Sequence, residues 1–199
     1  MLVKRGRKAF STILKQFEHK REVMRKYDIT SKGYDELYGD EQLDKYRLAF
    51  KNINDVGKTV LDVGCGTGLL YSFINSKKQQ FRSTGMYIGI DISYGMLEKA
   101  KPKIDQGTIL AELIRADADF LPFRSKVFDS VFAFTLLQNM PNPNVTCYEL
   151  LRVLKDKGLL ILSIPKSTNV NIDLQVEKIE KAKIKDTILL LKLNNRFTT

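Results

Sequence analysis

Three glycines alternate with small residues in the segment VLDVGCGTGLL, residues 60–70. A glycine loop between a strand and a helix usually holds a nucleotide, because glycine lets the backbone approach the ligand closely. The spacing here is G-x-G-x-G, at Gly64, Gly66 and Gly68, and it differs from the G-x-G-x-x-G of dinucleotide-binding loops. The G-K-[ST] of a triphosphate-binding loop is absent from the segment. The loop therefore predicts a nucleoside ligand without a pyrophosphate.

Two carboxylates narrow the chemistry of that ligand. Asp62 stands two positions before the first glycine, where it would repel a pyrophosphate and attract an ammonium group. Asp91 ends a second apolar run, YIGIDIS, at the position where an acidic residue binds a ribose diol. We therefore expect a nucleoside that carries a positively charged amino-acid tail, and S-adenosylmethionine has this chemistry.

Short apolar runs are predicted to form the strands that position these loops. The runs are residues 59–63, 86–91, 109–116, 130–135, 159–165 and 187–193. Helices are expected to begin near Gly68, Tyr94, Pro143 and Asn171, and the last is expected to run through residue 183. Such alternation indicates an α/β fold with a doubly wound, mostly parallel sheet of six to seven strands and helices on both faces. Only 187–193 reads as a strand after that last helix, so the sixth strand of a seven-stranded sheet is expected to be very short or missing.

The sequence resembles the class I S-adenosylmethionine-dependent methyltransferases, and within them the methyltransferase type 11 branch that includes quinone-biosynthesis enzymes. LDVGCGTG and GIDIS look like the first two motifs of the family. ADADFLPF, FDSVFAFTLLQNM and ELLRVLKDKGLLILSIP look like the three that follow, in family order. The motifs span residues 59–165, and they imply a Rossmann-like sheet with the cofactor at the point where the strand order reverses.

The resemblance also implies which residues bind the cofactor, whose product is S-adenosylhomocysteine. They are Asp62, Gly64, Cys65, Gly66, Thr67 and Gly68 at the methionine end, Asp91 and Ile92 at the ribose and adenine, Asp117 and Ala118 at the adenine, and Thr135, Leu136 and Leu137 near the reactive methyl. Asp119 competes with Asp117 as acceptor for the adenine amino group. No metal site is expected.

The first fifty residues differ in character from the rest. The chain has 199 residues and a net charge of +10, and ten Lys or Arg against three Asp or Glu lie within residues 1–32. Apolar residues at helical spacing between Phe10 and Tyr27 predict an amphipathic helix, and residues 34–53 predict a second helical region. We expect residues 1–52 to be a basic helical segment that covers the site, and residues 53–199 to be the S-adenosylmethionine-binding methyltransferase domain.

Methyl transfer from a sulfonium is an in-line displacement, and the loops after the strands show no strong general base, so no catalytic residue is assigned. The candidates on the substrate side are Tyr34, Tyr38, Gln138 and Asn139. The segment QNMPNP lacks the [DN]-P-P-[YFW] pattern of enzymes that methylate amino groups of bases or amides, and Cys147 is a poor nucleophile candidate for a C5-cytosine enzyme.

Three functions remain open at this point. The first is methylation of RNA, bound through the basic N-terminal helix, with a small zinc-binding activator protein as a further partner. The second is methylation of a small molecule or a quinone-like lipid, with the same helix on a membrane surface. The third is a non-catalytic cofactor-binding protein. Two cysteines without metal spacing favour a reducing compartment, the cytoplasm, and no apolar run reaches the length of a transmembrane segment.

Overall fold

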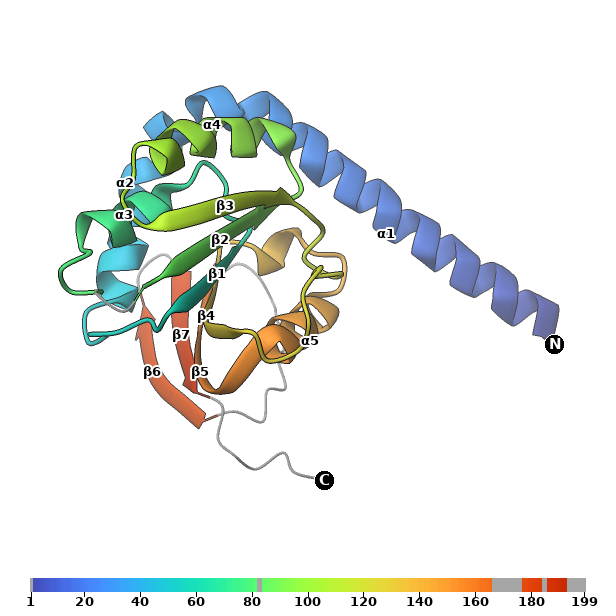
Figure 1. Cartoon of the computed structure of the whole chain (residues 1–199). Coiled ribbons are helices and arrows are strands. Elements are labelled where there is room, and N and C mark those ends of the chain that lie inside the picture. The colour runs from blue at the N-terminus through green and yellow to red at the C-terminus, as the bar shows by residue number, and fades with distance from the viewer. Residues whose placement is uncertain (1, 82–83, 166–176, 184–185, 193–199) are drawn as a thin grey trace.

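A seven-stranded sheet organises the chain. The computed structural model describes residues 2–81, 84–165, 177–183 and 186–192. The strand order is β3-β2-β1-β4-β5-β7-β6 (Figure 1). The strands are β1 (Thr59–Val63), β2 (Met86–Asp91), β3 (Leu110–Arg115), β4 (Phe128–Phe134), β5 (Leu154–Pro165), β6 (Glu177–Lys183) and β7 (Asp186–Lys192). Strands β1 to β5 pair in parallel, whereas β7 is antiparallel to both β5 and β6.

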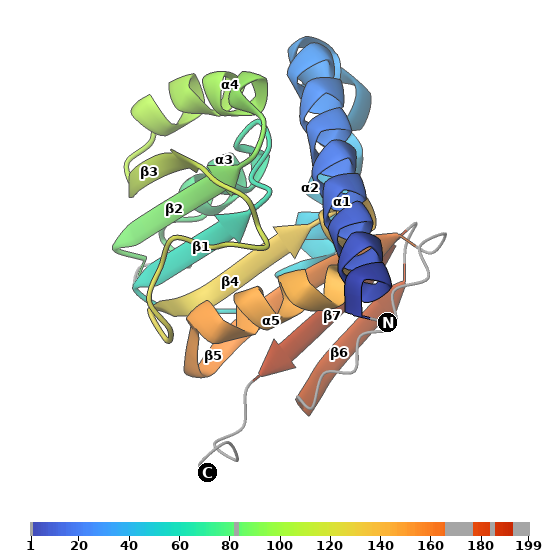
Figure 2. The ribbon, with the colours of Figure 1, turned by 90° about the vertical axis from the view of Figure 1, so that its right-hand side faces the viewer.

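Helices cover both faces of this sheet. They are α1 (Leu2–Thr30), α2 (Tyr34–Ala49), α3 (Leu69–Ser76), α4 (Tyr94–Asp105) and α5 (Pro143–Val153), with short 3₁₀ turns η1 (Ser31–Gly33) and η2 (Leu137–Asn139). Figure 2 shows α5 in front of the strands and α3 behind them. Phe73 and Phe132 belong to one apolar cluster, and Leu150 and Leu160 belong to another on the opposite face. Burial on both faces explains why the central strands read as continuous apolar runs.

The N-terminal helices share the core of the sheet. Tyr46, Ala49 and Phe50, at the end of α2, pack in the same cluster as Phe73. The C-terminal part of α1 packs against α4, while its first half extends away from the rest of the molecule (Figure 1). Within the described ranges, no helix is both long enough and apolar enough to cross a membrane.

The expected fold class is confirmed, and one element is wrong. The predicted strands overlap β1 to β5 and β7, with Leu193 outside the described residues. The helix predicted for 171–183 is instead strand β6 over Glu177–Lys183, and 171–176 lie outside the described residues. Its sequence, EKIEKAK, favours a helix locally, but pairing with β7 overrides that propensity. A charged sequence is also common in an edge strand, where it discourages pairing with other chains. The expectation that the sixth strand is very short or missing is therefore also wrong, because β6 has seven residues and completes the antiparallel end of the sheet.

Candidate functional site

Two adjoining pockets lie at the carboxyl ends of β1, β2 and β4, where the strand order reverses. The larger encloses about 710 Å³ and the smaller about 310 Å³, both including space open to solvent. They share four lining residues: Tyr34, Gly64, Gly66 and Phe134. A parallel sheet binds ligands at this edge.

The glycine loop forms the wall between the two pockets. Gly64 and Gly66 have φ angles of 74° and 54°, at which a residue with a side chain would be strained. A Cβ atom on Gly64 would also lie 3.0 Å from a methyl carbon of Leu136. The amides of Gly64 and Cys65 both donate to the Ile90 carbonyl at 2.9 Å, which ties the loop to the end of β2. The backbone is therefore fixed and bare where a ligand would approach it.

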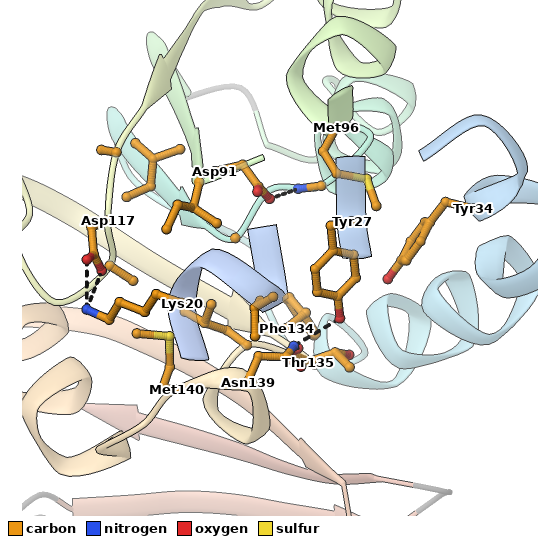
Figure 3. A pocket seen from close by; sticks show the side chains of 18 residues that line it. Lys20, Tyr27, Tyr34, Asp91, Met96, Asp117, Phe134, Thr135, Asn139 and Met140 are labelled. Carbon is orange, nitrogen blue, oxygen red and sulfur yellow. Dashed lines mark hydrogen bonds and ion pairs between the residues drawn. The ribbon is translucent and has the colours of Figure 1, made fainter. Parts of the chain in front are cut away.

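Asp91 lies at the end of β2, facing the larger pocket (Figure 3). One carboxylate oxygen accepts from the Gly66 amide at 2.9 Å and the other from the Ser93 amide at 2.8 Å. Burial raises the pKa of Asp91, although these amides act in the opposite direction. Each oxygen keeps a second lone pair, so the carboxylate can accept hydrogen bonds from two neighbouring hydroxyl groups.

Asp62 lies beneath the loop and lines the smaller pocket. It is 2% exposed, and the Tyr87 hydroxyl donates to it at 2.5 Å. Burial raises the pKa of Asp62 to about 7, the Tyr87 hydrogen bond lowers it, and nearby Asp91 raises it further. A positively charged group on a ligand would stabilise the ionised form of this buried carboxyl group.

Asp117 and Asp119 follow β3 and share one cation. The Lys20 ammonium of α1 contacts the two oxygens of Asp117 at 2.9 and 2.7 Å (Figure 3) and also lies 2.6 Å from a carboxylate oxygen of Asp119. Asp119 is 7% exposed and also accepts from the Thr146 hydroxyl. Only Asp117 lines the larger pocket, so of the two carboxylates it is the one that a ligand in that pocket meets.

Helix α1 forms a wall of the larger pocket through Lys20, Val23 and Tyr27. Asn139 donates to the Tyr27 hydroxyl at 3.0 Å, and a ring nitrogen of His19 lies 3.0 Å from the Asn139 carbonyl. Sequence reasoning did not assign Lys20 or Val23 to the site. The spacing of 20, 23 and 27 places them on one helix face, but it does not indicate which surface that face covers.

The loop after β4 is held in a strained conformation. Thr135 has a φ of 56°, which is uncommon for a residue with a branched side chain. Lys45 and Gln42 of α2 donate to its hydroxyl at 3.1 and 3.3 Å. Lys45 is 1% exposed, and Asp186 lies 2.8 Å from its ammonium. Contacts from α2 and β7 thus fix the residue expected to lie nearest the reactive methyl.

Most of the predicted site residues line these pockets. Gly64, Gly66, Asp91, Ile92, Asp117, Ala118, Thr135, Leu136, Tyr34 and Asn139 line the larger, and Asp62, Cys65 and Thr67 line the smaller. The Thr67 hydroxyl hydrogen-bonds to Asp35 at the start of α2. Val23, Met96, Ala116, Phe134 and Met140 join the larger pocket, and Gln42 joins the smaller, without having been assigned.

Four predicted residues line neither pocket. Gly68 precedes α3, where a Cβ atom would lie 3.1 Å from Ala100, and Leu137 is fully buried in the core beside α5. Tyr38 packs its ring on Tyr34, with centroids 5.0 Å apart, and is half exposed. Gln138 turns back to donate to the Thr135 carbonyl at 2.5 Å. Gln138 and Tyr38 therefore support residues that line the larger pocket.

The site is built to bind and orient a ligand. Burial raises the pKa of Tyr34 and of Tyr27, so both hydroxyls stay protonated and act as hydrogen-bond donors. Lys20, the lining residue with an ammonium group, is held by two carboxylates. The pockets combine acceptors for hydroxyl and amino groups with an apolar wall, and this suits a nucleoside.

Comparison with known proteins agrees with this geometry. Residues 61–162 match the family described as "Methyltransferase domain". A demethylmenaquinone methyltransferase of Staphylococcus aureus is 33% identical over 148 residues, which are 72% of this chain and 60% of that protein. The uncharacterized protein MJ1252 of Methanocaldococcus jannaschii is 34% identical over 162 residues, 79% of this chain and 58% of that protein. The chain therefore spans about three fifths of the length of these relatives.

A solved structure shows the same fold. It is the complex of the Haloferax volcanii Trm112 methyltransferase activator with its methyltransferase, and it matches with a TM-score of 0.68 and 17% identity. The match covers 84% of this chain and 96% of that one.

Proposed function

The chain belongs to the methyltransferase domain family, and from that premise we propose that it transfers the methyl group of S-adenosylmethionine to a small, largely apolar ring compound. The observation that carries the choice of acceptor is that one side of the larger pocket is uncharged and largely aromatic. Tyr27, Tyr34, Phe134 and Met140 contribute to it. Such a wall binds a flat ring through its faces and edges.

The residues present fit the cofactor. Asp91 offers two acceptors for the ribose hydroxyls, Asp117 an acceptor for the adenine amino group, and Asp62 a carboxylate for the methionine ammonium. When bound, S-adenosylmethionine supplies a methyl group on a positively charged sulfur. The protein contributes alignment and exclusion of water, and alignment alone can supply roughly 7–11 kcal/mol of the barrier.

The substrate-side residues orient the acceptor. The hydroxyls of Tyr34 and Tyr27 remain protonated, so they can donate to oxygen atoms on an acceptor ring. Asn139 fixes the Tyr27 hydroxyl, and its own amide also donates to the Thr135 carbonyl at 3.2 Å. The relatives named demethylmenaquinone methyltransferases support a ring acceptor of the quinone class.

RNA is a second candidate acceptor, favoured by the net charge of +10 and its concentration in α1. With RNA, a small zinc-binding activator is the expected partner, and the fold shared with a protein that forms a complex with Trm112 supports this. We further propose that residues 1–52 form a helical segment that covers the site and that residues 53–199 form the cofactor-binding domain. We also propose a cytoplasmic location. The two cysteines, Cys65 and Cys147, are buried and free, as suits a reducing compartment.

Calorimetric titration with S-adenosylmethionine and S-adenosylhomocysteine, with NADH as the control, tests the cofactor. We expect micromolar binding of the first two and none of NADH. A tritiated-methyl assay then compares a short-chain naphthoquinol with an RNA pool. Label in the quinol supports the proposal, label in RNA alone replaces it with the second candidate, and cofactor binding with label in neither leaves the non-catalytic function.

A further inference from the structure

Helix α1 is divided into two parts of different character. From His19 onward its side chains contact the rest of the molecule, through His19, Lys20, Val23, Tyr27 and Asp28. Before His19 the helix extends away from the sheet and the other helices (Figure 1). We refer to residues 2–18 as the projecting half of α1.

The projecting half is apolar on one side where its side chains are described. Ile13, Leu14 and Phe17 are 48%, 46% and 55% exposed. At about 100° per residue the three lie within an arc of about 100°, the width of an amphipathic stripe. Three large apolar side chains this close together are costly to leave in water unless something covers them.

The charge of the projecting half is strongly positive. Its sequence contains Lys4, Arg5, Arg7, Lys8 and Lys15, and the first acidic residue of the chain is Glu18. A surface that covers this helix segment must therefore be both anionic and apolar. An anionic lipid bilayer is both, because a basic amphipathic helix lies among the headgroups with its apolar side in the acyl chains.

We propose that the projecting half of α1 is a docking site for an anionic membrane surface. RNA would explain the charge but not the apolar stripe, because phosphate contacts come from Lys and Arg. A second copy of the chain would explain the stripe, but it would bring five more positive charges to the same place. The inference goes beyond the proposed function and does not depend on which acceptor is methylated.

Tryptophan fluorescence tests the site directly, because the chain contains no Trp. The 199-residue chain with Phe17→Trp is titrated with vesicles of phosphatidylcholine alone and with vesicles containing 30% phosphatidylglycerol. We expect a blue shift and quenching by brominated acyl chains with the anionic vesicles only. The control is Ile29→Trp, which is 79% exposed on the same helix and points about 120° away from position 17, and it should stay accessible to aqueous iodide.

Vesicle sedimentation measures the contribution of the stripe and of the charge. Ile13→Gln/Leu14→Gln/Phe17→Gln should lower partitioning at least tenfold. Lys4→Gln/Arg5→Gln should lower it about 25-fold, since each surface charge contributes about fivefold. The control is Arg21→Gln/Arg25→Gln, two exposed basic residues outside the projecting half, which should change partitioning less.

Three results would overturn the proposal. One is a native chain that does not bind the anionic vesicles. Another is an RNA oligonucleotide that binds the native and the triple-Gln chain equally while vesicles bind neither. The third is a dimer in sedimentation equilibrium that the triple-Gln change converts to monomer without any vesicle binding. None of these outcomes bears on calorimetric cofactor binding, so failure of this proposal is distinguishable from failure of the proposed function.

Discussion

The affinity for S-adenosylmethionine should rise with pH between 5.5 and 7.0, because of Asp62. Burial raises the pKa of this carboxyl to about 7, so it is only about 3% ionised at pH 5.5 and about half ionised at pH 7. If the ionised form is the one that pairs with the methionine ammonium, the apparent dissociation constant varies as the inverse of this fraction. The expected gain is about 15-fold, or about 1.6 kcal/mol. The range stops at pH 7 because an α-amino group begins to lose its own proton near pH 7.7–8.0.

Isothermal titration at pH 5.5, 6.0, 6.5 and 7.0 measures this dependence. Repeating the titration at pH 7 in buffers with different ionisation enthalpies should show release of about half a proton per cofactor bound. Asp62→Asn should bind more weakly at pH 7 and with an affinity that hardly changes over the range. His19→Asn removes the single histidine of the chain and should retain the native dependence. A native chain with the same affinity at all four values would refute the role of Asp62 at the ammonium.

The raised pKa of Asp62 also affects the stability of the protein without cofactor. Folding raises the pKa of Asp62 above its ordinary value near 3.8, so the folded state holds this proton more tightly between about pH 4 and pH 7. Ionising the group therefore costs stability as the pH rises through that window. In the absence of cofactor, the melting temperature of the native chain should fall relative to that of Asp62→Asn between pH 5 and pH 8. A constant difference would contradict the raised pKa.

Three substitutions probe other contacts. Asp91→Ala should weaken cofactor binding by about 1.5–3 kcal/mol in calorimetry, the contribution of hydrogen bonds to a charged group, and unchanged affinity would exclude its ribose role. Lys45→Met should lower the free energy of unfolding in urea by about 3 kcal/mol, because buried Asp186 keeps the Ser163 hydroxyl as a donor but loses its counter-charge. Lys45→Met/Asp186→Leu should recover most of that loss, because it removes the uncompensated charge. Lys20→Met should lower the free energy of unfolding by about 2–3 kcal/mol, because it removes the cation between Asp117 and Asp119. An unchanged free energy of unfolding would show that these ion pairs are weak.

The glycine loop and the ends of β1, β2 and β4 could be predicted from the sequence, because the conformation of the backbone near each residue determines its place in the site. Gly64 and Gly66 adopt positive φ angles, and Asp91 hydrogen-bonds to amides only 2 and 25 positions away in the chain. A short segment therefore encodes both the strand that buries the residue and the turn that exposes its carboxylate. The G-x-G-x-G spacing and the acidic strand ends carry this information together.

The contacts made by the N-terminal helices could not be predicted in this way. Lys20 meets Asp117 across 97 positions of the chain, and Lys45 meets Thr135 across 90. Helical periodicity identifies an apolar side of α1, but it gives no reason for a lysine on that side to approach two aspartates. The error at β6 has a related cause, since a Lys- and Glu-rich segment is a strand only because β7 provides a partner.

Asp119 explains how Asp117 can bind adenine while α1 stays in place. The Lys20 ammonium contacts both carboxylates, so an adenine amino group that takes one oxygen of Asp117 still leaves Lys20 with a counter-charge 2.6 Å away. Asp119→Asn keeps an acceptor for the Thr146 hydroxyl but removes that charge, so Lys20 should hold Asp117 more strongly. Cofactor affinity in calorimetry should then fall about three- to tenfold, although Asp119 does not line the pocket.

The matched control is Lys20→Met/Asp119→Asn, in which no cation competes with the adenine amino group for Asp117. Its affinity should lie above that of Asp119→Asn alone. Equal affinities in the native chain and in Asp119→Asn would mean that Lys20 and adenine do not share Asp117. In that case either α1 moves away and Lys20 leaves Asp117 when the cofactor binds, or α1 stays in place and the adenine amino group does not bind Asp117. The two explanations differ in a second observable, because a displaced α1 would expose the peptide bonds around Lys20 to proteases in the cofactor complex, whereas a seated helix would stay protected.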